Sequence, residues 1–259
     1  MNTEKRNKLS VIMPALNEEH NILGAIKDTL EAFEIFGIIG EIIVINDGSA
    51  DRTQAIAEEK AREHPEKIVI LKHLKPQGLG ASFWEGVDAA TGNFIVMLPG
   101  DNENDPQEIL RYYKLLEHVD IVIPFLFNRE VRSIFRNALS YLFRFIINTT
   151  FFVNFNYTNG TILYRKSILK ESNVYSSGFF FQTDILIRLV KKGYLFAEVP
   201  YRVRVRNKGV SKAVSFPSFF QVVRGYLRLL KDFSLRKEKF DSTSKFHSDS
   251  QTAARRKNF

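Results

Sequence analysis

The chain has 259 residues, of which 44% are hydrophobic and 25% are charged, so it is long enough for one large domain with a buried core. It contains no cysteine, which excludes disulfides and thiolate metal sites and favours a reducing compartment. The first apolar stretch is interrupted too early for a signal peptide, and we expect a cytoplasmic protein.

The net charge of +8 is unevenly distributed along the chain. Residues 1–124 hold 12 Lys and Arg against 21 Asp and Glu, whereas residues 125–235 hold 18 against 5. A basic second half predicts an anionic partner such as nucleic acid, a membrane surface or a phosphorylated substrate, although solvated helix faces give the same imbalance. Nucleic acid is the weakest of these partners, because the basic segment has neither a reading helix nor an RNA-binding signature.

Strands and helices alternate up to residue 124. Apolar runs predict strands, and amphipathic segments predict the helices between them. Asp51 suits an N-cap, and Pro106 suits the first turn of a helix. This alternation predicts a mostly parallel sheet with right-handed crossovers. The expected strands are residues 9–13, 41–45, 68–73, 93–98 and 120–124, and the expected helices are residues 18–36, 51–64, 79–90 and 106–118.

The pattern changes after residue 124. Residues 131–155 read as a long helix, but Arg144 and Asn148 within it argue against a transmembrane segment and favour an interfacial or core helix. An amphipathic helix is expected at residues 217–233, followed by a polar tail, residues 236–259, that we expect to be disordered. The remaining elements expected here are strands at residues 161–164 and 194–200 and a helix at residues 182–192.

Carboxylates cluster where two of the predicted strands end. Asp47 follows the second strand, and Asp101, Glu103 and Asp105 follow the fourth. The ends of parallel strands meet at one edge of the sheet, where α/β proteins place their ligands. These carboxylates predict one site that holds a nucleotide and its metal, against the simpler alternative of turns that cap helices. An EF-hand is excluded, because Pro106 stands where that loop needs glycine.

Five motifs in order resemble the dolichyl-phosphate or polyprenyl-phosphate sugar synthase branch of the family 2 inverting glycosyltransferases. The resemblance covers roughly residues 8–213 and implies the GT-A fold, an α/β domain whose mostly parallel central sheet is flanked by helices, here extended by the basic amphipathic helix at residues 214–235. It divides the domain into a nucleotide and metal half, residues 8–124, and an acceptor half, residues 125–213. The motifs are residues 11–19 (Val-Ile-Met-Pro-Ala-Leu-Asn-Glu-Glu), 44–53 (Val-Ile-Asn-Asp-Gly-Ser-Ala-Asp-Arg-Thr), 77–81 (Gln-Gly-Leu-Gly-Ala) with the acidic run at Asp101, 181–184 (Phe-Gln-Thr-Asp) and 206–212 (Arg-Asn-Lys-Gly-Val-Ser-Lys).

The resemblance also implies the nucleotide and metal sites. Asp101 and Glu103 are expected to hold Mg²⁺ or Mn²⁺ together with the diphosphate. The family pattern is Asp-x-Asp-x-Gln or a near variant, and this chain departs from it, because Pro99 stands in place of the first aspartate. The departure leaves open a shifted register, another metal preference or an inactive protein. The residues expected to contact the nucleotide are Pro14, Ala15, Asn17, Glu18, Asp47, Gly48, Gly78 and Asp101.

The acceptor half is expected to supply the cations. Arg206 and Lys212 would act on the diphosphate and on the acceptor phosphate, as Arg and Lys are suited to do. Asp184 stands where the branch usually has Glu and would orient the sugar or a basic side chain. The acceptor phosphate is expected to meet Ser211, Arg129, Arg132 and Arg136, although these arginines could equally form a solvated or lipid-facing helix surface.

The function expected from the resemblance is transfer of a hexose from a GDP or UDP sugar to a polyprenyl phosphate, such as dolichyl or undecaprenyl phosphate, with inversion. Two alternatives stay open: a saccharide hydroxyl acceptor with Asp184 as base, and a non-catalytic membrane-associated protein. The basic, aromatic second half predicts peripheral binding to the cytoplasmic face of an anionic membrane. A small membrane subunit or a second copy of the chain are further candidate partners. The residues expected to enter the headgroup region are Phe143, Phe145, Ile146, Ile147, Phe151, Phe152 and the helix at residues 217–233.

Overall fold

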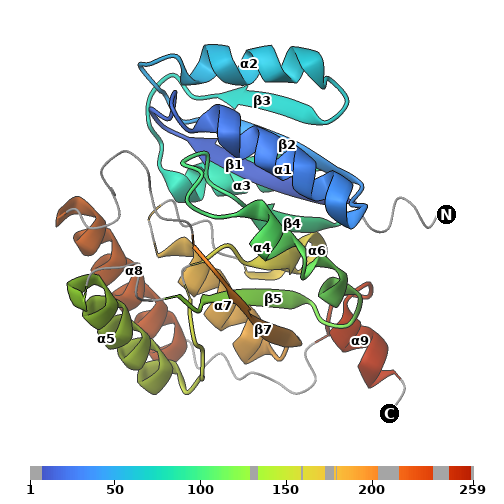
Figure 1. Cartoon of the computed structure of the whole chain (residues 1–259). Helices are drawn as coiled ribbons and strands as arrows, with labels where there is room; N and C mark the ends of the chain where they lie inside the picture. Colours follow the sequence, from blue (N-terminus) through green and yellow to red (C-terminus); the bar gives the residue numbers. More distant parts are fainter. Residues whose placement is uncertain are drawn as a thin grey trace.

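The computed structural model describes residues 8–128, 134–158, 160–172, 178, 180–203, 216–235 and 245–257. Within the helix at residues 216–235, the side chains of residues 216–219, 234 and 235 are not described. Figure 1 shows a central sheet with helices on both sides. The strands are β1 (Leu9–Ala15), β2 (Gly40–Asn46), β3 (Ile68–Lys72), β4 (Phe94–Met97), β5 (Ile121–Leu126), β6 (Leu163–Arg165) and β7 (Phe196–Tyr201).

The helices follow the predicted alternation closely. The main difference lies at residues 106–118, where a short helix and a separate 3-10 turn replace one long helix. The tighter turn places Tyr113 edge-on against Phe94, with ring centres 5.6 Å apart. The helices are α1 (Ile22–Phe36), α2 (Thr53–Glu63), α3 (Leu79–Ala89), α4 (Pro106–Leu110), η2 (Tyr113–Glu117), α5 (Ile134–Phe151), α6 (Lys166–Leu169), η4 (Lys170–Ser172), α7 (Phe181–Lys192), α8 (Phe216–Leu235) and α9 (Gln251–Arg256).

The sheet has seven strands in the order β3-β2-β1-β4-β6-β5-β7. The pairs β1–β2, β1–β4, β2–β3 and β5–β7 are parallel, whereas β6 runs antiparallel to both of its neighbours. All strands except β6 therefore end at the same edge, which we call the carboxyl edge. The opposite edge, where these strands begin, is the amino edge.

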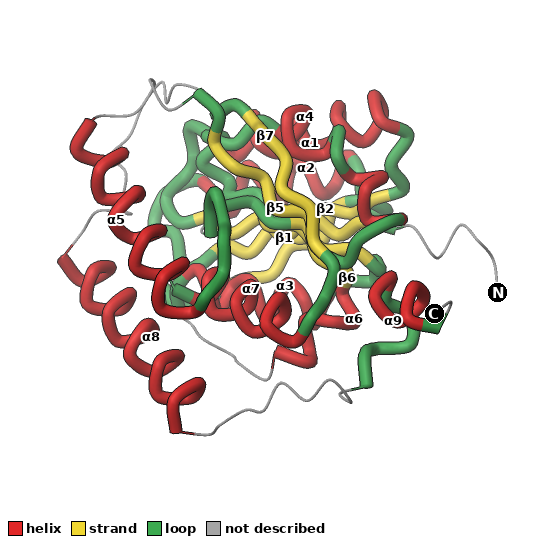
Figure 2. The backbone as a smooth tube through the Cα atoms, turned by 90° about the horizontal axis from the view of Figure 1, so that it is seen from below, coloured by secondary structure: helices red, strands yellow, loops and turns green. Residues whose placement is uncertain are grey.

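Alternate strand residues bury against two separate helix layers, as the two-residue period of a strand requires. Val11 faces a core under α1, α2 and α4, whereas its neighbour Ile12 faces a core under α3, α6 and α7. The two layers lie on opposite sides of the sheet in Figure 2. Because both faces are covered, the strands are nearly continuous apolar runs.

Helices α5 and α8 lie side by side at one flank of the sheet (Figure 2). Phe151 of α5 packs edge-on against Tyr226 and Phe233 of α8, with ring centres 6.1 and 5.5 Å apart. Ile147 and Phe151 are buried, and Phe143 is half-buried against Phe180. The prediction that these three side chains enter a membrane surface is therefore wrong, because they form the inner face of the α5–α8 pair.

The end of the chain is anchored at the amino edge by Asp120, a fully buried residue just before β5. Its carboxylate accepts hydrogen bonds from the backbone N–H groups of Gln251 (2.6 Å) and Thr252 (3.0 Å) and from the Thr252 hydroxyl (2.5 Å). Arg165 donates to the same carboxylate at 3.3 Å. The prediction of a disordered tail is wrong for residues 245–257, because this clasp orders α9 against the sheet.

Candidate functional site

The two predicted carboxylate turns flank the end of the same strand, β1. The N–H of Asp47, after β2, donates to the carbonyl of Ala15 at 2.9 Å, and the N–H of Gly100, after β4, donates to the carbonyl of Pro14 at 3.0 Å. Since β2 and β4 are the two neighbours of β1, the turns lie two strand spacings apart, about 10 Å. Both turns therefore lie at the carboxyl edge, as the sequence predicts.

Asp47 is buried, and its carboxylate is bonded to the protein itself. One oxygen accepts from the N–H of Gln77 (2.7 Å) and faces Nδ1 of His73 (2.6 Å), and the other accepts from the N–H of Gly78 (3.0 Å). Asp47 therefore holds residues 73–78 at the start of α3. These three partners occupy most of the positions at which the Asp47 carboxylate can accept a hydrogen bond, so little capacity remains for a nucleotide. Asp47 therefore organises this side of the candidate site through the loop that it binds.

The turn after Asp47 is tightly packed against the same loop. Gly48 has a left-handed backbone (φ 75°), and a Cβ added to it would lie 2.7 Å from the carbonyl carbon of Lys75. Gly78 also has positive φ, at 96°, and directly precedes α3. Both positions predicted for the nucleotide site thus require glycine for the backbone path.

The segment after β1 is joined to the turn after β2. Asn17, which has a left-handed backbone (φ 56°), donates its N–H to Ser49 Oγ and accepts from the N–H of Ala50, both at 2.9 Å. The N–H of Glu18 donates to Thr53 Oγ1 at 2.8 Å. The carboxylate of Asp51 accepts from the N–H of Thr53 at 3.0 Å, but the N-cap of α2 is Arg52, so the prediction of Asp51 as the N-cap is wrong by one residue.

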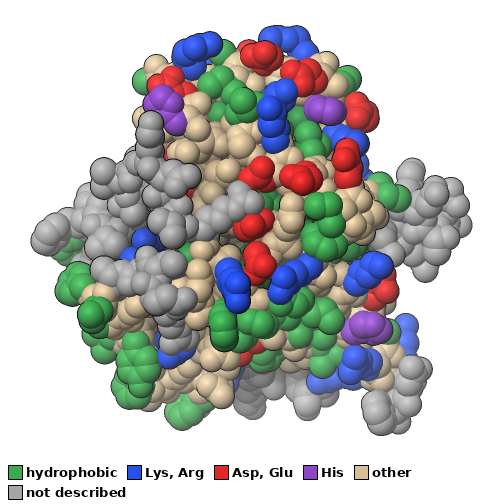
Figure 3. Space-filling model, in the orientation of Figure 1, with side chains coloured by type: hydrophobic (Ala, Val, Ile, Leu, Met, Phe, Trp, Pro, Cys, Tyr) green, Lys and Arg blue, Asp and Glu red, His purple; other side chains and the backbone are tan. Residues whose placement is uncertain are grey.

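The acidic loop after β4 combines a tight turn with a helix cap. Asp101 accepts from the N–H of Glu103 at 3.1 Å, and Asn102 between them has a left-handed backbone (φ 54°). Asp105 caps α4 by accepting from the N–H of Gln107 at 2.9 Å, and Pro106 is the first helical residue, as expected. Among the described residues no group of three or more His, Asp and Glu is arranged to hold a metal ion. Figure 3 shows acidic side chains gathered on this face, over α1, α4 and the loop before α4.

Two distant segments meet this loop at Val203, just after β7. Asn104 forms an antiparallel bridge with Val203. Asn128, just after β5, holds the same residue from the other side, because its side chain accepts from the N–H of Val203 and donates to its carbonyl, both at 3.0 Å. The Asp101 loop and the ends of β5 and β7 are thereby joined.

All but one of the cations predicted to act at the site belong to the two segments that follow this junction in the sequence. Residues 129–133 follow Asn128, and residues 204–215 follow Val203. Arg136 is described and is half-exposed near the start of α5. Arg129, Arg132, Arg206, Ser211 and Lys212 lie outside the described residues.

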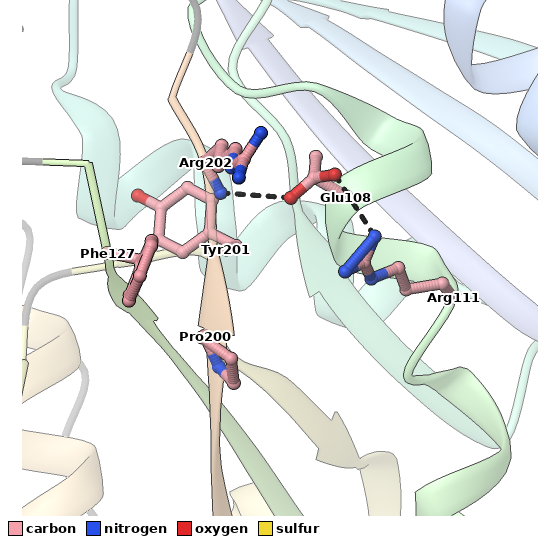
Figure 4. Close-up of a pocket in the computed structure, with 6 residues that line it drawn as sticks. All are labelled: Glu108, Arg111, Phe127, Pro200, Tyr201 and Arg202. Carbon is pink, nitrogen blue, oxygen red and sulfur yellow. Dashed lines mark hydrogen bonds and ion pairs between the residues drawn. The ribbon is translucent and has the colours of Figure 1, made fainter.

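A pocket of about 200 Å³ lies beside the junction, at the ends of β5 and β7. Figure 4 shows its aromatic wall, made by Phe127 and Tyr201, and an ion-paired wall on α4. There Glu108 accepts from the N–H of Arg202 at 3.0 Å and from the guanidinium of Arg111 at 3.1 Å. The pocket therefore combines apolar surface with two arginines, at the same edge as the carboxylate turns.

Asp184 lies on α7 and is 1% exposed. It accepts from Nε of Arg188 at 2.7 Å, and Arg228 of α8 lies 3.5 Å from its other oxygen. Burial raises the pKa of Asp184, and the two arginines oppose that shift. The sequence predicted that Asp184 would orient either the sugar or a basic side chain. In the structure it binds a basic side chain, that of Arg188.

Sequence reasoning missed several residues that build this edge. His73 directly follows β3, and Asn128 comes two residues after the end of β5, so a search for polar residues near strand ends would have included both. Glu85 lies within α3 and gives no local signal. The bridge between Asn104 and Val203 joins residues far apart in sequence and could not be read from either segment.

The fold defines the class of protein first. A crystal structure of glucosyl-3-phosphoglycerate synthase from Mycobacterium tuberculosis with uridine diphosphate matches with a TM-score of 0.66, at 20% identity, over 86% of this chain and 80% of that chain. The fold is thus the GT-A type that the sequence predicts.

Sequence comparison then gives the family. Residues 10–172 match glycosyl transferase family 2, so the chain belongs to that family and is a glycosyltransferase. A polyprenol monophosphomannose synthase from Mycolicibacterium smegmatis is 29% identical over 226 residues, 78% of this chain and 79% of its own length. An undecaprenyl-phosphate 4-deoxy-4-formamido-L-arabinose transferase from Salmonella paratyphi B is 31% identical over 144 residues, 55% of this chain and 44% of its own length.

Proposed function

We propose that this glycosyltransferase transfers a hexose from a GDP or UDP sugar to a polyprenyl phosphate, with inversion and with the help of a divalent metal. The observation that carries the proposal is the junction at Val203. It joins the acidic loop of Asp101 to Asn128 and Val203, the residues that both arginine-containing segments, residues 129–133 and 204–215, follow in the sequence. An acidic loop suits a metal and its diphosphate, and the adjoining basic segments suit the phosphate of an acceptor.

The names of two relatives support the acceptor. The polyprenol monophosphomannose synthase and the undecaprenyl-phosphate transferase are both named for lipid phosphates, and both align with this chain. The pocket between Phe127, Tyr201 and the two arginines has the mixed character that a phosphate with an apolar chain requires. Its lining residues at the ends of β5 and β7 lie at the same edge of the sheet as Asp101.

The residues present fit a Mg²⁺ or Mn²⁺ ion. Asp101 and Glu103 are hard oxygen donors on a half-exposed loop, and such ions are commonly bound by one or two carboxylates, with the remaining ligands from phosphate and water. Another structure of the mycobacterial synthase holds Mn²⁺, uridine diphosphate and glucosyl-3-phosphoglycerate, with a TM-score of 0.64 at 19% identity. When bound, the metal would neutralise charge on the departing diphosphate.

The remaining chemistry falls to the chain's own residues. Arg206 and Lys212 would stabilise the negative charge that grows on the leaving phosphate oxygen as the anomeric carbon is attacked from the opposite side. A lipid monophosphate is largely ionised near neutral pH, because its second pKa is about 6, so it needs no general base. This agrees with Asp184, whose carboxylate is engaged by Arg188.

The deciding experiment follows a radiolabelled sugar from GDP and UDP donors. Label in the organic-extractable fraction, dependent on added polyprenyl phosphate and Mn²⁺, supports the proposal. Label transferred instead to a soluble saccharide, with loss in Asp184→Asn, would establish the hydroxyl-acceptor alternative. Metal-dependent nucleotide binding without transfer to any acceptor would indicate a non-catalytic protein.

We also propose that α5 and α8 bind the cytoplasmic surface of an anionic membrane. Hydrophobic side chains gather over α5 in Figure 3. On α8, Arg224 and Lys231 are exposed beside the apolar positions. None of the helices in the described part of the chain combines the length and apolar character needed to span a bilayer. The exposed large apolar residues are Ile134, Phe135, Leu139, Tyr141, Leu142, Phe145 and Ile146 on α5, Phe152 just after it, and Phe220, Val223 and Leu227 on α8.

Flotation with anionic liposomes tests this surface. We expect binding at low salt that weakens at high salt, because each basic residue near the surface contributes about 1 kcal/mol. The double variant Leu142→Ser/Phe145→Ser removes two side chains that are 53% and 57% exposed, and we expect binding to fall at least about 10-fold. Ile35→Ser on α1, 54% exposed and away from α5, is the matched control. Equal recovery of wild type and the double variant with liposomes would contradict the proposal.

A further inference from the structure

His73 lies between two carboxylates at the carboxyl edge. It follows β3 and its side chain is 4% exposed. Nδ1 lies 2.6 Å from the carboxylate of Asp47, and Nε2 contacts the carboxylate of Glu85 on α3. Because each ring nitrogen faces an acceptor, the arrangement suits an imidazolium that donates from both nitrogens.

This ring closes a unit made of three segments. The backbone N–H of His73 donates to the carbonyl of Asn46 at 2.9 Å, which joins β3 to the end of β2. Asp47 in turn binds the N–H groups of Gln77 and Gly78. Residues 74–77, which His73 precedes, are exposed, with Leu74 at 98%, and they pack over Gly48. The exposed loop is thus anchored at its first residue by His73 and at its last by Asp47.

We propose that His73 is a positioning residue, which fixes the Asp47–Gly48 turn and residues 74–78 as one rigid surface for the nucleotide of the donor. This proposal rests on the proposed function, because that function places a nucleotide at this edge. His73 would act through Asp47 and the loop, without touching the nucleotide, since its ring is buried.

The charge of His73 makes the unit sensitive to pH. Burial alone lowers the pKa of His73, but the hydrogen bonds and charges of Asp47 and Glu85 outweigh it, so the pKa is raised. These two groups, from the turn after β2 and from α3, are the charged groups that face the ring among the described residues, and Lys72 on β3 is exposed. With a raised pKa, the contribution is complete below the ordinary histidine pKa of about 6.5 and is lost as pH rises through the higher folded value.

Two measurements on two variants, His73→Gln and Glu85→Gln, test the proposal. Glu85→Gln keeps an acceptor oxygen but removes the negative charge. The first is amide hydrogen exchange at Gln77 and Gly78 in the full chain without ligand. The second is the affinity for UDP and GDP with Mn²⁺, measured from about pH 6 to about pH 9, either side of the usual histidine pKa. His118→Gln, at an exposed histidine, is the matched control.

We expect His73→Gln to speed exchange at both amides about 10-fold or more and to weaken nucleotide binding at least about 5-fold, as loss of a charged hydrogen bond predicts. Wild-type affinity should fall with rising pH, and the variant should lose that dependence. Glu85→Gln, at a half-exposed side chain, should show the same changes at about two- to threefold and serves if His73→Gln does not fold. Unchanged exchange and affinity would overturn the role of His73. If wild type binds neither nucleotide, the proposed function fails, while the exchange rates still decide whether His73 positions the loop.

Discussion

At both edges of the sheet, a buried aspartate binds backbone N–H groups of a distant segment. At the carboxyl edge, Asp47 accepts two backbone N–H groups at the start of α3, and at the amino edge, Asp120 accepts two at the start of α9. Both are buried, and each faces a basic side chain, His73 or Arg165. Their hydrogen bonds alone do not distinguish the aspartate of the proposed site, Asp47, from the other.

The surroundings of the two aspartates make the difference. Asp47 binds the end of an exposed loop, residues 74–77, and follows β2, which is next to β1. The acidic loop of Asp101 follows β4, on the other side of β1. Near Asp120, Thr252 and Arg165 are themselves buried, and the bonds end in the protein interior. A buried carboxylate that binds backbone N–H groups is thus a structural clamp in itself, and it serves a site only where the clamped segment faces solvent beside other reactive groups.

The largest effect is expected at the amino edge. Asp120→Ala leaves Arg165 buried without its partner, which should lower the free energy of unfolding by about 3–5 kcal/mol. Urea denaturation measures the loss, and transfer per folded molecule should stay within about twofold of wild type. Thr252→Val, which removes the hydroxyl that donates to Asp120, should cost about 1–2 kcal/mol. Loss of transfer without loss of stability in Asp120→Ala would contradict a purely structural role for Asp120.

A second prediction concerns pH and Glu41, which also lies at the amino edge. Although burial raises the pKa of Glu41, hydrogen bonds from Lys8, Ser10 and Thr91 lower it from 4.5 to about 2. A lowered pKa gives stability that is complete above the unfolded value and is lost as pH falls through the folded value. Wild type should therefore lose about 3 kcal/mol from this group between about pH 4.5 and about pH 2.

Thermal unfolding across this acid range, compared between wild type and Glu41→Gln, checks that prediction. The difference in melting temperature between the two should shrink as the pH falls, because protonated Glu41 resembles glutamine. A constant difference over the whole range would mean that Glu41 is not the group responsible.

The carboxyl edge should show the opposite pattern, a loss of activity without a loss of stability. Asp101→Asn keeps the acceptor for the N–H of Glu103 but removes the charge, so stability should change by less than about 0.5 kcal/mol. Sugar transfer should fall about 100-fold, about 2.7 kcal/mol of transition-state stabilisation, with a higher Mn²⁺ requirement. The control is Glu117→Gln, an exposed carboxylate in η2. Full activity in Asp101→Asn would remove this loop from the proposed metal site.

The sequence alone predicted most elements of the first half and placed Asp47 and Asp101 at one edge of the sheet. Strand and helix periods are local properties, and the Asp105–Pro106 cap is readable because a cap involves residues a few positions apart. The positions of Asp47 and Asp101 followed from the same logic, since parallel strands deliver their ends to one edge. The inner face of α5 was missed, because apolar residues lie on several sides of that helix and only the neighbouring α8 decides which are buried.

Tertiary structure decided which groups are partners. The carboxylate of Asp120 binds Gln251 and Thr252, which lie 131 and 132 positions later in the chain. Asn128 binds Val203, which lies 75 positions later. Such pairings depend on strand order and on the path of the chain around the sheet, which no local pattern encodes. For the same reason, the sequence predicted Asp47 as a candidate site residue, but only the folded chain shows that it binds His73 and the N–H groups of Gln77 and Gly78.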